Sequence, residues 1–98
     1  MDILFEIKDK KGKIVYLSRE RWKHTVSEHP TLSNSLEKIK ETILSPLTIK
    51  SSIYDKNLKL YFRYYKERGE YLMVIAKYLN GYAFIITSYY VRNIKNEK

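Results

Sequence analysis

The hydrophobic pattern of this chain changes its period near Leu47, and that change constrains the fold more than any other feature. After Leu47, apolar and polar residues alternate in successive runs, which the turn sequence 67–70 and the pair Asn80-Gly81 separate. Alternation of this kind is typical of antiparallel strands that bury one face. We therefore expect a four-stranded antiparallel β-meander over residues 47–91.

A short β-hairpin is expected at the start of the chain. Residues 3–7 and 14–17 are rich in Ile, Leu, Val, Phe and Tyr, and a polar stretch with one glycine lies between them. Strands of this length around such a stretch indicate a tight turn. The hairpin would therefore precede everything else in the fold.

Two helices are expected between the hairpin and the meander. Ser18 is a suitable N-cap for a helix over 19–28, which Pro30 would end. Asn34 and Glu37 resemble a capping box that would open a second helix running to about residue 44.

The expected fold class is therefore α+β, with two N-terminal helices, after a short hairpin, packed on a four-stranded antiparallel meander. A chain of 98 residues supports one domain over residues 1–98. Lys and Tyr side chains at alternate strand positions would line the sheet face that the helices leave open.

The charge of the chain points to a polyanionic partner. Nineteen Lys and Arg residues against eleven Asp and Glu residues give a formal net charge of +8, which attracts phosphate-rich polymers. Ten tyrosines are compatible with stacking on unpaired bases, although tyrosine is also a favoured strand residue. We therefore expect a nucleic acid as the partner, while high charge also serves solubility alone.

Two absences in the sequence exclude other classes of protein. There is no cysteine, which excludes disulfides, thiolate metal sites and a cysteine nucleophile. No apolar run is long enough for a membrane span, and charges occur throughout the first twenty residues where a signal peptide would be apolar. We expect a cytoplasmic protein that does not bind membranes.

His24 and His29 are the only histidines. Their spacing of five places them about 140° apart on an ideal helix, so they do not form the i, i+4 pair of a helical zinc site, and no metal is expected. His24 and Glu28 are four apart. A carboxylate beside an imidazole suits a general base or acid, but a solvated helix pair has the same sequence.

The last strand ends in a group of hydroxyls and one guanidinium. Thr87 and Tyr89 share one face, Ser88 and Tyr90 share the other, and Arg92 follows. A phosphate site needs such donors with a positive charge, whereas many strands satisfy them with backbone or water. Lys77 would add a second charge if it lies on the Thr87 face, which depends on the length of the Asn80-Gly81 loop.

These two segments together resemble a known family. The helix segment 21–30 reads Arg-Trp-x-His-x-x-x-x-His-Pro, and the strand segment 84–92 reads Phe-Ile-Ile-Thr-x-Tyr-x-x-Arg. In this order and separation they resemble the phage- and mobile-element-associated nuclease domains of the barnase/EndoU/colicin/RelE (BECR) superfold, over residues 14–92. The resemblance implies a helix pair on a four-stranded sheet and a toxin-like endoribonuclease that cleaves RNA without a metal ion or cofactor.

The resemblance also implies roles for individual residues. A ribose 2′-hydroxyl would attack its own phosphate, with His24 as base or acid. The implied catalytic set is His24, His29, Thr87, Tyr89 and Arg92, and the expected substrate-binding set is Arg21, Lys77, Ser88 and Tyr90. Family members often carry Glu, Thr and Arg where this chain has Thr31, Val91 and Asn93, so a weakened or repurposed copy is an open alternative.

A free ribonuclease would harm its host, so we expect an acidic antitoxin or immunity protein as the partner of the nuclease.

Two other functions compete with the nuclease hypothesis. A non-catalytic RNA- or DNA-binding module with the same basic, tyrosine-rich sheet is the first alternative. A protein-interaction domain whose charge is incidental is the second.

Overall fold

The computed structural model describes residues 2–94, and its elements follow the order that the sequence predicts. The first half of the chain holds β1 (Ile3–Lys8), β2 (Ile14–Ser18), α1 (Arg19–Glu28), the 3-10 turn η1 (Pro30–Leu32) and α2 (Leu36–Leu44). The second half holds β3 (Thr48–Ser51), β4 (Leu58–Tyr65), β5 (Glu70–Tyr78) and β6 (Tyr82–Val91). The predicted α+β class is confirmed.

The strands of residues 2–94 form one mixed sheet of six strands in the order β1-β2-β6-β5-β4-β3. The segment from β3 to β6 is an antiparallel meander, but β2 joins its edge in parallel with β6, pairing Ile14 with Tyr82 and Tyr16 with Phe84. The prediction of a four-stranded antiparallel sheet is therefore wrong for the sheet as a whole. The alternation that reveals a strand is local, whereas the choice of β6 as neighbour for β2 depends on tertiary packing.

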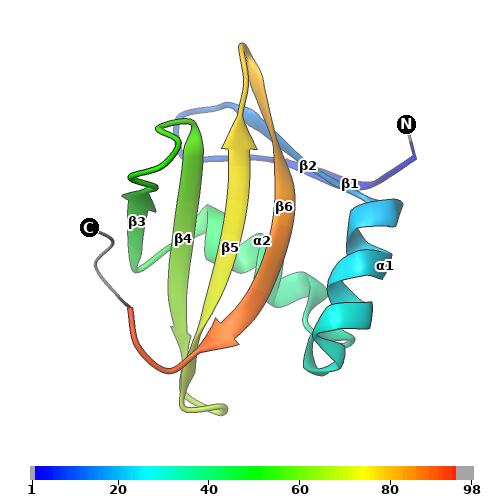
Figure 1. Ribbon diagram of the computed structural model, residues 1–98, viewed down its shortest axis with the longest axis vertical. Coiled ribbons are helices and arrows are strands. Elements are labelled where there is room, and N and C mark those ends of the chain that lie inside the picture. The colour runs from blue at the N-terminus through cyan, green and yellow to red at the C-terminus, as the bar shows by residue number, and fades with distance from the viewer. Residues whose placement is uncertain (1, 95–98) are drawn as a thin grey trace.

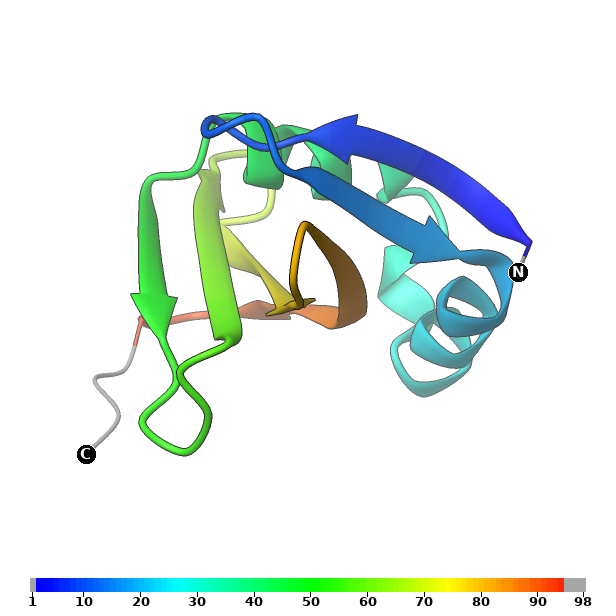
Figure 2. The ribbon, with the colours of Figure 1, turned by 90° about the horizontal axis from the view of Figure 1, so that it is seen from above.

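The first hairpin bends over the meander. It crosses steeply behind β5 and β6 in Figure 1, and Figure 2 shows it on the same side of the meander as α2. Phe5, Val15 and Leu17 of this hairpin pack in one core with Ile39 and Ile43 of α2. Burial of this apolar surface holds the hairpin in place.

Helix α1 has the predicted bounds, and local hydrogen bonds explain both ends. The Ser18 side chain accepts a hydrogen bond from the Arg21 N–H at 3.1 Å. At the other end, the His29 N–H donates to the Thr25 carbonyl at 2.8 Å, and Pro30 begins η1. The helix then lies beside the second half of β6, where β2 has already ended (Figure 1).

Helix α2 begins at Leu36, and the predicted capping box is wrong. Ser35 occupies the N-cap position and its side chain makes no capping hydrogen bond, because its hydroxyl is paired with that of Tyr90 at 2.8 Å.

Within the described residues, no helix has the length and apolar character needed to cross a membrane.

The strand register divides the sheet into two faces. The helix-covered face carries Val74, Ala76 and Ile85, which pack with α2 in the main core, and α2 lies behind β4 and β5 in Figure 1. We call the opposite side the helix-free face. It carries a second, smaller cluster made of Leu60, Phe62 and Met73. A β-bulge between the Ile75–Thr87 and Ala76–Ile85 pairs shifts the register of β6.

Candidate functional site

The end of α1 meets the end of β6 on the helix-free face. The ring of His29 stacks on the ring of Tyr89, with centroids 4.9 Å apart and planes inclined by 24°. Thr87 and Tyr89 pair with Ile75 and Met73, so both lie on the helix-free face. We call His29, Thr87 and Tyr89 the helix–strand site. The structure thus brings the imidazole at the C-cap of α1 onto the ring of Tyr89, on the strand face that also carries Thr87.

Arg92 belongs to the same region. A pocket of about 490 Å³ is lined by Tyr89 and Arg92 together with Asn93 and the apolar side chains Leu60, Phe62, Met73 and Val91. Arg92 is exposed. The ring of Tyr89 therefore contacts His29 and also lines a pocket that carries a guanidinium.

His24 lies apart from these groups. It is exposed on α1, and its side chain makes no hydrogen bond, ion pair or ring contact with any described residue. Glu28 is exposed as well, and no ion pair joins it to His24. The structure therefore places His29, Thr87, Tyr89 and Arg92 in one region and leaves His24 outside it.

The tyrosine hydroxyls differ between the two faces. Those of the helix-covered face are all hydrogen-bonded: Tyr61 with Tyr78, Tyr78 to Asp9, Tyr65 to Glu41, and Tyr90 with Ser35. On the helix-free face, the hydroxyls of Tyr16, Tyr64, Tyr71, Tyr82 and Tyr89 make no hydrogen bond with another described residue. The ring nitrogens of His29 are equally unpaired within residues 2–94. The polar ends of this face are therefore available to a ligand.

Two of the predicted substrate-binding residues lie on the wrong face for that role. Ser88 is 1% exposed and its hydroxyl donates to the Met73 carbonyl at 2.7 Å. Tyr90 is held by Ser35, and the guanidinium of Arg68 lies over its ring at 3.7 Å from the centroid. Because alternate residues of a strand point to opposite faces, neither side chain is placed to meet a substrate on the helix-free face.

Lys77 lies on the same face as Thr87, a point that the sequence alone did not decide. The loop between β5 and β6 has three residues, 79–81, and the bulge in β6 sets Thr87 opposite Ile75, two positions from Lys77. The Lys77 ammonium forms a hydrogen-bonded ion pair with Asp55. That bond lowers the pKa of the Asp55 carboxyl. The charge of Lys77 is therefore shared with a carboxylate of its own chain.

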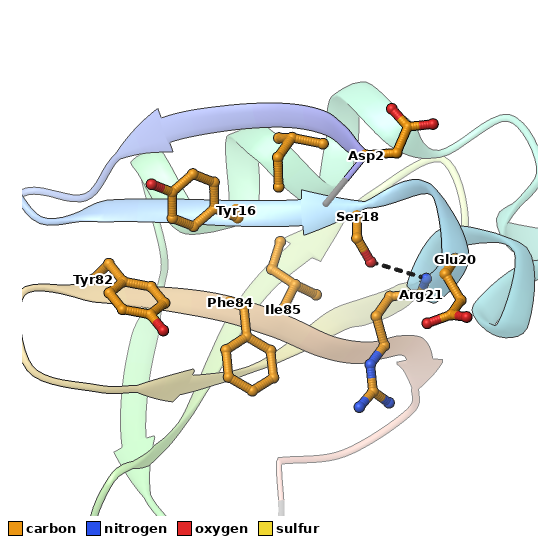
Figure 3. Close-up of a pocket in the computed structure, with 9 residues that line it drawn as sticks. Asp2, Tyr16, Ser18, Glu20, Arg21, Tyr82, Phe84 and Ile85 are labelled. Carbon is orange, nitrogen blue, oxygen red and sulfur yellow. Dashed lines mark hydrogen bonds between the residues drawn. The ribbon is translucent and has the colours of Figure 1, made fainter.

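Arg21 lines a second and larger pocket of about 740 Å³, between β2, β6 and the first turn of α1 (Figure 3). Tyr16 and Tyr82 contribute to its wall, with ring centroids 5.8 Å apart and an angle of 73° between their planes. Phe84 pairs with Tyr16 across the parallel strands and lines the same pocket. Sequence reasoning missed this pocket because it depends on the β2–β6 pairing; the abundance of tyrosine was the only signal.

Within residues 2–94, no three His, Asp or Glu side chains lie close enough together to hold a metal ion. Comparison of the chain with protein-family models, with curated proteins and with solved structures finds no match. The candidate site is therefore defined by its geometry: an imidazole stacked on a phenol, a neighbouring hydroxyl and a guanidinium at the edge of a pocket.

Proposed function

We propose that this chain is a ribonuclease that works without a metal ion and that the helix–strand site is its active site. The stacking of His29 on Tyr89 is the observation that carries the proposal. Imidazole is the side chain that most often exchanges protons in enzymes near neutral pH. The unpaired ring nitrogens of His29 and the net charge of +8 support a reaction on RNA.

In the proposed reaction, His29 takes the proton of a ribose 2′-hydroxyl, and the freed oxygen attacks the adjacent phosphorus. The bond from phosphorus to the 2′-oxygen forms as the bond to the 5′-oxygen breaks, which leaves a 2′,3′-cyclic phosphate. The Tyr89 hydroxyl gives its proton to the departing 5′-oxygen. The products are a cyclic phosphate end and a free 5′-hydroxyl end.

Arg92 and Thr87 complete the proposed site. The guanidinium of Arg92 would stabilise the negative charge that grows on the non-bridging phosphoryl oxygens. The Thr87 hydroxyl, on the same face as Tyr89, would donate a hydrogen bond to the same phosphate. Proton transfer is assigned to His29 rather than His24 because His29 is the one that contacts β6.

Cleavage of single-stranded RNA in EDTA, followed by analysis of the new ends, tests the proposal. We expect His29→Ala to lower the rate by about 100-fold or more, the usual contribution of general acid–base catalysis. Arg92→Ala should cause a loss of about the same size. Arg19→Ala is the matched control, because Arg19 is an exposed arginine paired with Asp2 at 3.1 Å and lies outside both pockets.

Two results would contradict the proposal. One is RNA that stays intact in EDTA; the other is cleavage that continues at the wild-type rate in His29→Ala. Circular dichroism must show that each variant is folded. Tyr89→Phe, which keeps the ring under His29 and removes only the hydroxyl, separates proton donation from ring stacking, and Tyr64→Phe on the same face is its control.

A non-catalytic RNA-binding module is the second candidate, favoured by the unpaired tyrosine hydroxyls of the helix-free face. Such a module would leave RNA intact and would bind it with an affinity that falls steeply with salt. For the nuclease, an acidic inhibitor protein is the partner whose charge would complement the net charge of +8.

A further inference from the structure

The larger pocket combines aromatic and charged walls. Tyr16, Tyr82 and Phe84 line it from the two parallel strands, and Glu20 and Arg21 line it from the first turn of α1. In Figure 3, the ring of Phe84 and the guanidinium of Arg21 point to the same side, in front of β6. Its volume of about 740 Å³ is within the range of about 300–1,000 Å³ that is usual for small-ligand sites.

Three side chains of this pocket, those of Tyr82, Glu20 and Arg21, remain accessible to a ligand. Tyr82 is 40% exposed. The side chains of Glu20 and Arg21 make no hydrogen bond or ion pair with another described residue. An exposed aromatic ring can stack on a base, and a guanidinium can bind phosphate or stack on a base itself. The pocket thus suits one nucleotide of a single strand.

Glu20 adds a requirement on the base edge. An ionised carboxylate only accepts hydrogen bonds and has two oxygens with which to do so. Guanine presents two adjacent donors, N1–H and the N2 amino group, which can bond both oxygens at once. The Watson–Crick edges of adenine, cytosine and uracil each present one donor position. A carboxylate at the rim therefore favours guanine.

We propose that this pocket binds an unpaired guanine base of the RNA that reacts at the helix–strand site, with Glu20 reading its donor edge and Tyr82 and Phe84 providing the stacking surface. The identity of the ligand as RNA rests on the proposed function. Phe84 and Tyr89 are five residues apart on β6, about 16 Å along a strand. The bound guanine would therefore lie near the reacting nucleotide on the same strand of RNA.

Binding to short 2′-O-methyl RNA tests this inference separately from cleavage, because the methyl group blocks the attacking hydroxyl. The probes are fluorescein-labelled uridine heptamers in which the central base is U, G, A or C, measured by fluorescence anisotropy at low salt. We expect the guanine probe to bind about five- to tenfold more tightly than the all-uridine probe, as one bidentate base contact allows.

Variants identify the groups responsible. Glu20→Gln should reduce the guanine preference to less than about twofold while binding to the all-uridine probe is retained. Glu37→Gln is the matched control, because Glu37 is an exposed carboxylate in the first turn of α2. Tyr82→Leu should weaken binding of every probe by about fivefold or more. Tyr64→Leu, which changes an exposed tyrosine on β4 of the same face, should weaken it less.

Equal affinity for the four probes, or a guanine preference that survives Glu20→Gln in folded protein, would overturn the inference. Neither result depends on RNA cleavage, so the cleavage assay would test the nuclease proposal independently. Guanine-selective binding by a chain that cuts no RNA would support the pocket assignment and overturn the nuclease proposal instead.

Discussion

Tyr78→Phe should destabilise the protein because the Tyr78 hydroxyl ties the first hairpin to the meander. That hydroxyl donates to Asp9 Oδ2 at 2.8 Å and is also hydrogen-bonded with the Tyr61 hydroxyl. Asp9 lies in the turn between β1 and β2, where its Oδ1 accepts hydrogen bonds from the N–H groups of Lys11 and Lys13, each at 2.9 Å. One phenol oxygen therefore connects segments 69 positions apart.

The size of the effect follows from the two bonds that are lost. A hydrogen bond to a charged group contributes about 1.5–3 kcal/mol, and a buried hydroxyl left without its partner costs about 1–3 kcal/mol. Tyr61, the partner left behind, is 3% exposed. The two contributions overlap, so we expect the free energy of unfolding to fall by about 2–3 kcal/mol. In a domain of this size, Tm should fall by roughly 10 °C or more.

Urea unfolding followed by circular dichroism at pH 7 measures this change. Tyr71→Phe is the matched control: it is the same substitution on the same strand, but the Tyr71 hydroxyl has no hydrogen-bond partner among the described residues. Its free energy of unfolding should change by less than about 0.5 kcal/mol. Equal destabilisation by the two substitutions would refute the reasoning, because it would mean that removing the hydroxyl bonded to Asp9 and Tyr61 costs no more than removing an unbonded one.

The same hydroxyl should make wild-type stability sensitive to alkaline pH. Burial, together with the bonds to Tyr61 and Asp9, raises the pKa of Tyr78 above its ordinary value, which is about 10. A raised pKa means that the stabilisation is complete below about pH 10 and is lost as the pH rises further. Tyr78→Phe should therefore lose stability less steeply than wild type above about pH 10.

Three further predictions test separate parts of the structure. Ser18→Ala should lower the free energy of unfolding by about 1 kcal/mol through loss of the α1 cap, whereas Asn34→Ala should change it by less than about 0.5 kcal/mol, both measured in urea. Burial raises the pKa of Tyr65 to about 12. Between about pH 10 and pH 12, the free energy of unfolding of wild type should therefore fall by up to about 1.4 kcal/mol per pH unit relative to that of Tyr65→Phe, again measured in urea. Ser88→Ala should lower the free energy of unfolding by about 1 kcal/mol. It should leave the affinity for RNA, measured by fluorescence anisotropy, unchanged, because Ser88 is buried on the helix-covered face. Weaker RNA binding by the folded variant would contradict that placement.

Where a structural feature depends on neighbouring residues alone, the sequence predicts it well. Ser18 and Pro30 set the ends of α1 at the predicted residues, because caps and proline act over one helical turn. Strand alternation correctly separates Thr87 and Tyr89 from Ser88 and Tyr90. Alternation alone does not predict which of these two pairs of side chains lies on the helix-covered face.

Features that depend on competition between partners were harder to predict. Asn34 and Glu37 form a plausible capping box by spacing, but Ser35 takes the N-cap position and its hydroxyl pairs with Tyr90, 55 residues away. The faces of Lys77 and Thr87 agree because of a three-residue loop and a bulge. A one-residue change in either would have reversed the result.

The sequence by itself determined the α+β class, the positions of the helices and most strands, the basic charge and the residues available for chemistry. Tertiary structure decided that β2 pairs in parallel with β6, which creates the aromatic pocket, and that His29 rather than His24 contacts Tyr89. The physical reason is range: dihedral preferences, caps and hydrophobic periodicity act between residues close in sequence, whereas strand partners and the neighbours of a side chain are fixed only when distant apolar surfaces are buried together.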